Sequence, residues 1–264
     1  MAMNDALLLG AITIVSFVLA FYGAAAGLIL GHLRLPLLGY YLPSAASASA
    51  TNLAISGLGA LTGTIRHARA GRISLRVLAL MGIPSVAGAV LGAWVMLKVD
   101  ADWARIFVGG FLMVSGVNLV YSHPEEGGSV LFNRGLRMAL EILIGLALGF
   151  LAVVTGLMMG SMRLPMMIKW LRIDPRVAVG SNMAVGCLTA FAGVISFWSQ
   201  GKEFHLTPLL IIAPPTILGG WLGAKWTGKI RKESLALLVG WMVAGSGLVM
   251  VGEGLWRSAA KWLG

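Results

Sequence analysis

Short charged clusters divide the chain into long apolar blocks, and the length of these blocks limits the folds that it can adopt. Hydrophobic residues make up 58% of the 264 residues and charged residues only 11%, whereas a soluble domain carries about a quarter charged residues. A helix that crosses a membrane needs about 20 mostly apolar residues. The sequence contains roughly eight such stretches: residues 6–30, 43–65, 74–97, 104–121, 137–160, 176–198, 206–226 and 234–256. We therefore expect an all-α, polytopic membrane protein with about eight transmembrane segments.

The basic residues of the chain also follow the pattern of a membrane protein. The net charge of +10 comes mainly from residues at the ends of the predicted spans, where lysine and arginine orient a protein and meet anionic headgroups. We therefore expect the lipid bilayer as a partner and no nucleic acid. The four histidines show no metal-ligand spacing, and the single cysteine, Cys187, cannot form an intramolecular disulfide. Neither a metal nor a cofactor is expected.

An internal repeat connects the two parts of the chain. The string GLILGHLRLPLL at 27–38 resembles GLMMGSMRLPMM at 156–167, and residues 48–71 resemble residues 178–201. The shared positions keep an offset of 129 to 131 residues, and they include Gly31/Gly160, Arg34/Arg163, Pro36/Pro165 and Asn52/Asn182. We infer two homologous halves, residues 1–122 and 134–264, joined by a linker at 123–133. Duplicated membrane helices are the usual build of a secondary transporter.

The charges of equivalent loops differ between the halves, which bears on their orientation. In the first half the loop at 66–76 carries four arginines, whereas the equivalent loop has only Lys202 and Glu203. One loop later the pattern is reversed, with a balanced loop at 98–105 and a net charge of +3 at 225–233. Positive loops favour the cytoplasm, so the charges favour an inverted repeat. Because four crossings per half would make the halves parallel, inversion requires a broken, re-entrant first segment, for which 35–42 and 164–171 are candidates. A parallel arrangement stays open as the alternative.

The motifs resemble those of the TauE/SafE family of sulfite exporters. The likeness rests on the Gly27–Pro36 string, on Thr51 and Asn52 in a small-residue helix, and on HARAGRIS at 67–74, and it extends over both halves. The glycine-to-proline spacing of the family is kept at Gly31/Pro36 and Gly160/Pro165. The resemblance implies transport of small sulfur-containing anions, such as sulfite or sulfonates, across a bacterial inner membrane.

The repeated polar residues are our candidates for a substrate site. Arginine offers a rigid fork of donors that stays charged, and a broken helix offers free backbone N–H groups. Glycine lets the backbone approach a ligand closely, and the prolines should place the break. The predicted substrate-binding residues are Arg34, Arg163, Gly31, Gly160, Thr51, Asn52, Ser181 and Asn182. Two alternatives remain: the arginines could snorkel to headgroups, and the small polar residues could serve only in helix packing.

Two titratable residues are candidates for proton coupling. Glu141 is a carboxylate within a predicted span, where a carboxylate can carry protons. His32 lies inside the repeated motif and could titrate during transport. The alternative for Glu141 is a position at the membrane interface.

Three classes of function fit the sequence unequally. We predict a secondary transporter, expected to be an exporter, that moves a small sulfur-containing anion through a central site between the two repeats. The alternatives are an anion channel and a membrane-embedded enzyme. An enzyme should show a nucleophile, base or metal constellation, and we find neither this nor a phosphate-binding loop. The sequence leaves a homo-oligomer open.

Overall fold

The computed structural model describes residues 2–28, 30–42, 45–95, 133–201, 205–227, 229 and 231–263, with shorter stretches between 106 and 121. The described part of the chain is helical and contains no strands. The first half contains α1 (Ala2–Ala26), α2 (Gly31–Tyr41), α3 (Ala45–Arg69), α4 (Leu75–Val77), the π-helix η1 (Leu78–Gly82) and α5 (Ile83–Val95). The second contains α7 (Arg134–Thr155), α8 (Gly160–Pro165), the π-helix η3 (Met166–Trp170), α9 (Pro175–Ser199), α10 (Leu206–Thr227) and α11 (Lys232–Leu263).

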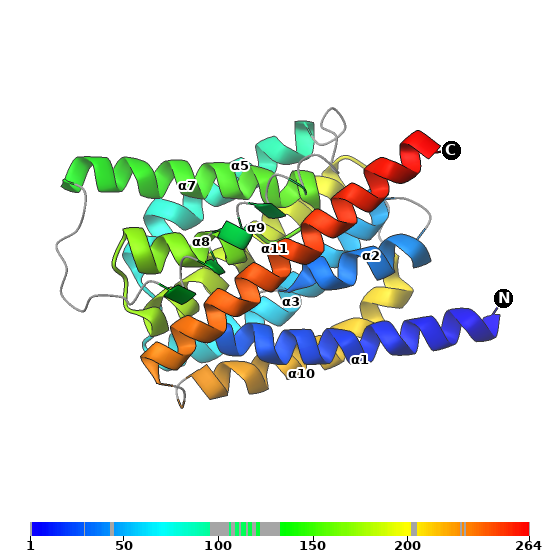
Figure 1. Ribbon diagram of the computed structural model, residues 1–264, viewed down its shortest axis with the longest axis horizontal. Coiled ribbons are helices and arrows are strands. Elements are labelled where there is room, and N and C mark those ends of the chain that lie inside the picture. Colours follow the sequence, from blue (N-terminus) through cyan, green and yellow to red (C-terminus); the bar gives the residue numbers. More distant parts are fainter. Residues whose placement is uncertain are drawn as a thin grey trace.

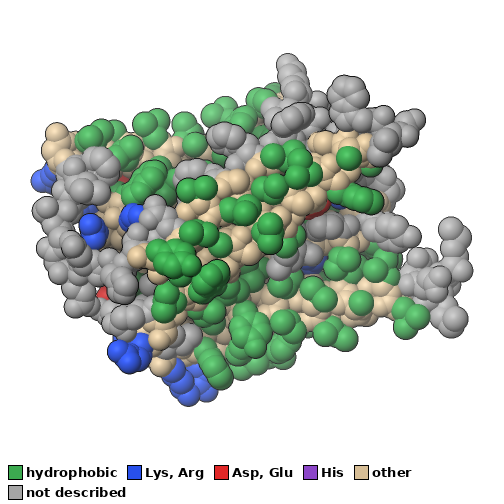
Figure 2. Space-filling view, in the orientation of Figure 1, with side chains coloured by type: hydrophobic (Ala, Val, Ile, Leu, Met, Phe, Trp, Pro, Cys, Tyr) green, Lys and Arg blue, Asp and Glu red, His purple; other side chains and the backbone are tan. Residues whose placement is uncertain are grey.

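The prediction of a multi-pass membrane protein is confirmed, although the number of spans is confirmed only in part. Among the described residues, 5 helices are long and apolar enough to cross a membrane: Leu7–Ala26, Leu75–Val95, Arg134–Thr155, Pro175–Ser199 and Leu206–Thr227. Much of the predicted span at 104–121 lies outside the described residues. Hydrophobic side chains cover much of the described surface of the face shown in Figure 2, and Lys and Arg side chains gather at its left end.

The first long helix of each half is followed by a break and a short helix. After α1, Gly27 takes φ of 72°, and after α7, Gly156 takes φ of 70°. This left-handed conformation suits glycine, which has no side chain to clash. Each break ends where a short helix begins, at Gly31 and at Gly160. The short helix α2 turns back along the bundle, so that α1 and α2 lie side by side (Figure 1).

The predicted role of the prolines is wrong. Pro165 lies inside the short helix α8, and position 36 lies inside α2, so neither proline marks the break. Instead, Pro165 is followed directly by the π-helix η3. Because proline has no N–H to donate, a shift of the hydrogen-bond ladder lets the helix continue past it. The positive-φ glycines set the breaks.

The first long helix of each half packs against a helix of the other half. Helix α1 packs along α10, and α7 packs along α5. A Cβ added at Gly219 or Gly223 would overlap the backbone carbonyls of Phe17 and Phe21, respectively. A Cβ added at Gly88 or Gly92 would overlap the carbonyls of Leu146 and Phe150. These four pairs are equivalent under the sequence offset of 129 to 131 residues, so the same glycines make the same close contacts in each half.

Equivalent helices in the centre of the molecule run in opposite directions. In α3 and α9, Gly57 faces Ala190, Gly63 faces Met183, and Gly193 faces Leu53, so the residue numbers rise in one helix as they fall in the other. The residues around 109–116 and those of α11 also run in opposite directions. Gly247 packs against Gly109, and Gly240 packs against Gly116, in two further segments that share VG and SG pairs at an offset of 131.

The two most basic loops lie at one end of the bundle. The guanidinium carbon of Arg66, at the end of α3, lies 4.7 Å from the ring centroid of Trp221, near the end of α10. The α3–α4 loop and the α10–α11 loop are therefore neighbours, at the left in Figure 1. The start of α1 and the end of α11 both lie at the opposite end.

Candidate functional site

Arg34 points from the short helix α2 into a polar cluster on α3. Its side chain is only 3% exposed. Nε donates to Oδ1 of Asn52 over 3.0 Å, and Nη2 donates to the carbonyl of Asn52 over 3.2 Å and to Oγ of Ser56 over 2.6 Å. A Cβ at Gly31 would overlap Ser56 and Asn52, so glycine at the first position of α2 allows this approach.

Arg163 forms an equivalent cluster in the second half, with one different partner. Its side chain is 1% exposed. Nη1 donates to Oδ1 of Asn182 over 3.2 Å, and Nη2 donates to Oγ of Ser85 over 3.2 Å. The partner Ser85 belongs to α5 of the first half, whereas Ser56 belongs to the same half as Arg34. Nε of Arg163 has no hydrogen-bond partner among the described residues.

The two asparagines join each arginine cluster to the break of the opposite half. Asn52 donates from Nδ2 to the carbonyl of Gly156 over 3.0 Å. Asn182 donates from Nδ2 to the carbonyl of Gly27 over 2.7 Å and to that of Gly160 over 3.0 Å. Each amide therefore satisfies a carbonyl that a broken helix leaves free. The sequence alignment of Asn52 with Asn182 thus corresponds to equivalent positions in space.

The arginine clusters contain positive charge without a carboxylate partner. Among the described residues, neither Arg34 nor Arg163 forms an ion pair. Both side chains are buried and held by neutral acceptors, so the snorkelling alternative does not describe this structure. An isolated buried charge is costly, and an anion that entered such a cluster would compensate it. The arrangement therefore favours an anionic ligand.

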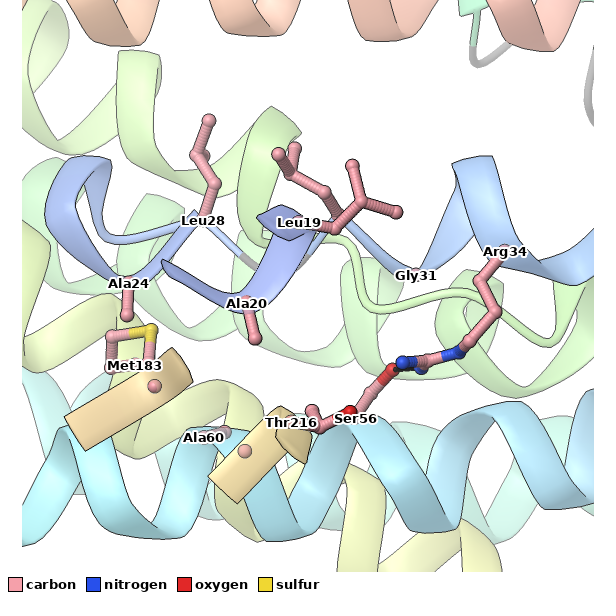
Figure 3. A pocket seen from close by; sticks show the side chains of 13 residues that line it. Leu19, Ala20, Ala24, Leu28, Gly31, Arg34, Ser56, Ala60, Met183 and Thr216 are labelled. Atoms are coloured by element: carbon pink, nitrogen blue, oxygen red, sulfur yellow. Dashed lines mark hydrogen bonds between the residues drawn. The ribbon is translucent and has the colours of Figure 1, made fainter. Parts of the chain in front are cut away.

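A cavity lies beside Arg34 (Figure 3). It encloses about 330 Å³ of empty space, but a water molecule could be centred in only about 20 Å³ of it. In Figure 3, Arg34 and Ser56 meet at one end of the cavity and Met183 lies at the other. The lining comes from α1, α2, α3, α9 and α10, with Thr216 and Gly220 from the last of these. The cavity is thus narrow, and a hydrated anion would need it to widen.

The predicted single site for both arginines divides into two clusters. Arg34 and Gly31 line the cavity, whereas Arg163 and Gly160 are not among its lining residues. Ser56 replaces the glycine found at the equivalent position 186, and this difference gives Arg34 a hydroxyl partner within its own half. Arg163 reaches Ser85 instead.

The remaining predicted site residues have different surroundings. Ser181 is buried and accepts a hydrogen bond from the backbone N–H of Ser74 over 2.9 Å, so it holds the start of α4. Thr51 is buried, and its hydroxyl has no hydrogen-bond partner among the described residues. The side chain of His32 lies outside the described residues, so its predicted titration stays a prediction.

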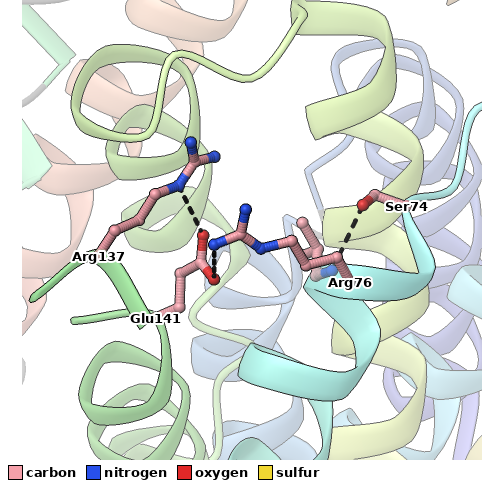
Figure 4. Close-up of polar contacts among 5 residues, drawn as sticks. Ser74, Arg76, Arg137 and Glu141 are labelled. Carbon is pink, nitrogen blue, oxygen red and sulfur yellow. Dashed lines mark hydrogen bonds and ion pairs between the residues drawn. The ribbon is translucent and has the colours of Figure 1, made fainter. Parts of the chain in front are cut away.

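Glu141 is buried in an ion-pair network near the start of α7 (Figure 4). Its Oε1 is 3.1 Å from Nε of Arg137, and its Oε2 is 3.4 Å from Nη2 of Arg76. The carboxylate is 1% exposed, whereas the Arg76 side chain is 46% exposed. The contact with Arg76 joins α7 of the second half to α4 of the first. Glu141 therefore has a structural role, and its predicted proton coupling needs a separate test.

Sequence reasoning missed Ser56, Ser85 and most of the cavity lining. Ser56 follows Asn52 by four residues on α3, so a helical pattern places both on one face, and that signal could have found it. Ser85 and Thr216 occupy equivalent positions in α5 and α10, but only the packing of the opposite half brings them to the arginine clusters.

Metal binding finds no support in the described part of the chain. No group of three or more His, Cys, Asp or Glu side chains there could hold a metal ion. Cys187 is a buried free thiol on α9.

Comparison with known proteins agrees with this architecture. The model of the sulfite exporter TauE/SafE family matches residues 9–250. A probable membrane transporter protein of Methanocaldococcus jannaschii is 24% identical, over 93% of this chain and 96% of its own length. The probable membrane transporter proteins YdhB and YunE of Bacillus subtilis are 25% and 20% identical, over 90% and 78% of this chain and 96% and 80% of their own lengths. No solved structure shows a significant match. The family and these relatives are transporters rather than enzymes, and the chain belongs to the TauE/SafE sulfite exporter family.

Proposed function

We propose that this protein is a secondary transporter that exports a small sulfur-containing anion, such as sulfite or an organosulfonate, across the bacterial inner membrane. The observation that carries the proposal is the buried Arg34 cluster at the edge of a cavity, in which the described residues place no carboxylate beside the guanidinium. The family description supplies the class of substrate.

The chemistry of the Arg34 cluster suits an oxyanion. Among the described residues, the hydrogen bonds of Arg34 engage Nε and Nη2 and leave Nη1 for a ligand. Arginine keeps its charge, and the remaining Nη1 group can donate a charge-assisted hydrogen bond to an oxyanion. Asn52 and Ser56 hold the guanidinium in place before the anion arrives, which reduces the entropic cost of binding. The hydroxyl of Ser56 lines the cavity and supplies a neutral polar contact.

The Arg163 cluster has a supporting role in this proposal. Its guanidinium joins α8 to Asn182 on α9 and to Ser85 on α5, so it bridges elements of both halves. Its Nε lacks a partner among the described residues, and an anion could occupy this position at another stage of the transport cycle. Two equivalent clusters, one in each half, would then alternate in contacting the substrate.

An inverted repeat is part of the proposal. Antiparallel packing of the equivalent helices α3 and α9, together with the returning short helices α2 and α8, supports it. In a membrane, this arrangement puts both basic loops on one side, which the positive-inside rule assigns to the cytoplasm. Alternating access would then come from rocking of one half against the other.

A carrier fits the cavity better than a channel does. A water molecule could be centred in only about 20 Å³ of the space beside Arg34, whereas a conducting channel needs a continuous path wide enough for the ion. An anion must therefore open the site on one side and then on the other.

Counterflow in proteoliposomes tests this function. Vesicles loaded with unlabelled sulfite should transiently accumulate labelled sulfite, because a carrier exchanges substrate across the membrane. Sulfate, thiosulfate, sulfoacetate and taurine, tested as competitors, should define the preferred anion. A linear, non-saturable flux without counterflow would indicate a channel, and the absence of flux for every anion would reject the substrate class.

A further inference from the structure

A second, larger cavity opens at the basic end of the bundle. It encloses about 600 Å³ of empty space, and it is lined by Arg66, Arg69, Ala70, Arg72, Trp221 and Lys225. These residues come from the end of α3, from the loop that follows it, and from the last turns of α10. We call them the basic pocket. The basic pocket is separate from the Arg34 cavity, because the two share no lining residue.

The cations of the basic pocket lack acidic partners. Among the described residues, none of its four cations forms an ion pair. Instead, the guanidinium carbons of Arg66 and Arg69 lie 4.7 and 5.8 Å from the ring centroid of Trp221. Burial, followed by the charges of Arg176 and Arg66, lowers the pKa of Arg72 from its usual value. Mutual repulsion of these charges would be relieved by an anion.

Apolar side chains continue from the basic pocket along the outside of the same two helices. On α3, Leu61 and Ile65 are 37% and 38% exposed, and the next residue of this row is Arg69. On α10, Leu218 and Leu222 are 54% and 37% exposed, and the row ends at Lys225. Residues three or four apart share one helix face. Each helix therefore presents an apolar row that ends in a cation.

We propose that the basic pocket binds the phosphate of an anionic phospholipid whose two acyl chains follow the apolar rows, one along α3 and the other along α10. A phospholipid matches both features, because its negative phosphate lies next to its hydrocarbon. Tryptophan at the level of the headgroups is common in membrane proteins, and cationic side chains attract anionic lipids there. A free oxyanion would use the cations alone.

Native mass spectrometry of the detergent-purified protein tests the proposal directly. Dioleoyl phosphatidylglycerol, an anionic lipid, is titrated against dioleoyl phosphatidylethanolamine, which has no net charge. We expect tight binding of the first lipid. The double variant R66Q/R69Q should weaken it by about 25-fold, at about fivefold for each charge near the surface. The matched control R134Q/R257Q also removes two charges, but outside the basic pocket, and should bind the lipid as the original protein does.

Competition separates a lipid from a soluble anion. Inorganic phosphate or sulfite, added at the same concentration as the lipid, should displace little phosphatidylglycerol, because neither gains from the apolar rows. The variant I65S/L222S should also weaken lipid binding. Both I65S/L222S and R66Q/R69Q should unfold at nearly the temperature of the original protein. Displacement by the soluble anions, or equal loss in both charge variants, would overturn the lipid assignment. These measurements do not use transport, so their outcome is independent of the proposed export.

Discussion

Asn52 donates a hydrogen bond across the two halves to the carbonyl of Gly156, over 3.0 Å, while its own side-chain oxygen accepts from Nε of Arg34. Asn182 repeats this arrangement with Gly27 and Arg163. Each asparagine side chain thus contacts an arginine in its own half and a helix break in the other half. Movement of one half relative to the other must therefore disturb both arginine clusters, which couples the site to the packing of the repeats.

The reciprocal glycine contacts should be essential for stability. Gly88→Ala and Gly219→Ala would each place a Cβ against a backbone carbonyl of the facing helix. Such overpacking typically costs about 1–3 kcal/mol, so both variants should unfold at a lower temperature in detergent. Gly10→Ala and Gly252→Ala are matched controls, because nothing lies within 4 Å of a Cβ at either position. Equal stability of all four variants would contradict the close packing of α1 with α10 and of α5 with α7.

A carboxylate at position 56 should compete with the anion. Ser56 lies 2.6 Å from Nη2 of Arg34 and lines the cavity. In Ser56→Asp, the new carboxylate would pair with the guanidinium, so the protein should fold and lose anion counterflow. Ser56→Ala removes the hydroxyl but keeps the charge of Arg34, and it should lower the affinity only several-fold, consistent with one lost hydrogen bond. Normal counterflow by the aspartate variant would show that the anion does not bind at Arg34.

Labelling of single cysteines tests the orientation of the halves. In a Cys187→Ala background, Ala70→Cys lies in the α3–α4 loop, Lys229→Cys lies after α10, and Ala259→Cys lies near the end of α11. A membrane-impermeant maleimide should label the first two from the cytoplasm and the third from the opposite side. Labelling of positions 70 and 229 from opposite sides would support the parallel arrangement.

Glu141 should contribute to stability and not to proton coupling. Glu141→Gln weakens the ion pairs with Arg137 and Arg76. The free energy of unfolding should fall by only about 1–2 kcal/mol, because the partly exposed arginines regain hydration. Sulfite uptake should keep its response to an imposed pH gradient. A variant that retains counterflow but no longer responds to the gradient would instead identify Glu141 as the proton carrier.

The paired polar residues could be predicted from the sequence, because the same residues recur at a common offset. Arg34 with Asn52 and Arg163 with Asn182 meet in space as the common offset implies. The helix breaks were predicted from the same strings, but they were assigned to the prolines. A helix can continue past a proline when a π-turn accommodates the missing N–H donor. The better sequence signal was the glycine at 27 and 156, and both glycines take a positive φ at the breaks.

The partners from the opposite half could not be predicted in the same way. Ser85 contacts Arg163 only because α5 packs along α7, and the division into two clusters follows from that exchange of helices. Sequence periodicity identifies which face of a helix is buried, but it does not identify the helix that covers it. The sequence also contains VG pairs at 108–109 and 239–240 and SG pairs at 115–116 and 246–247. These pairs would have strengthened the evidence for the repeat.

The affinity of Arg34 variants for sulfite in the counterflow assay tests the central claim most directly. Arg34→Lys keeps the charge but loses the planar guanidinium that Asn52 and Ser56 hold in place, so the half-saturating concentration should rise on the order of tenfold. Arg34→Gln loses the charge and should abolish saturable exchange, although the protein should stay folded because the guanidinium has no acidic partner among the described residues. Arg257→Gln removes a cation that does not line the cavity, and this variant should exchange sulfite as the original protein does. If both Arg34 variants fold and exchange sulfite with unchanged half-saturation, Arg34 does not bind the anion.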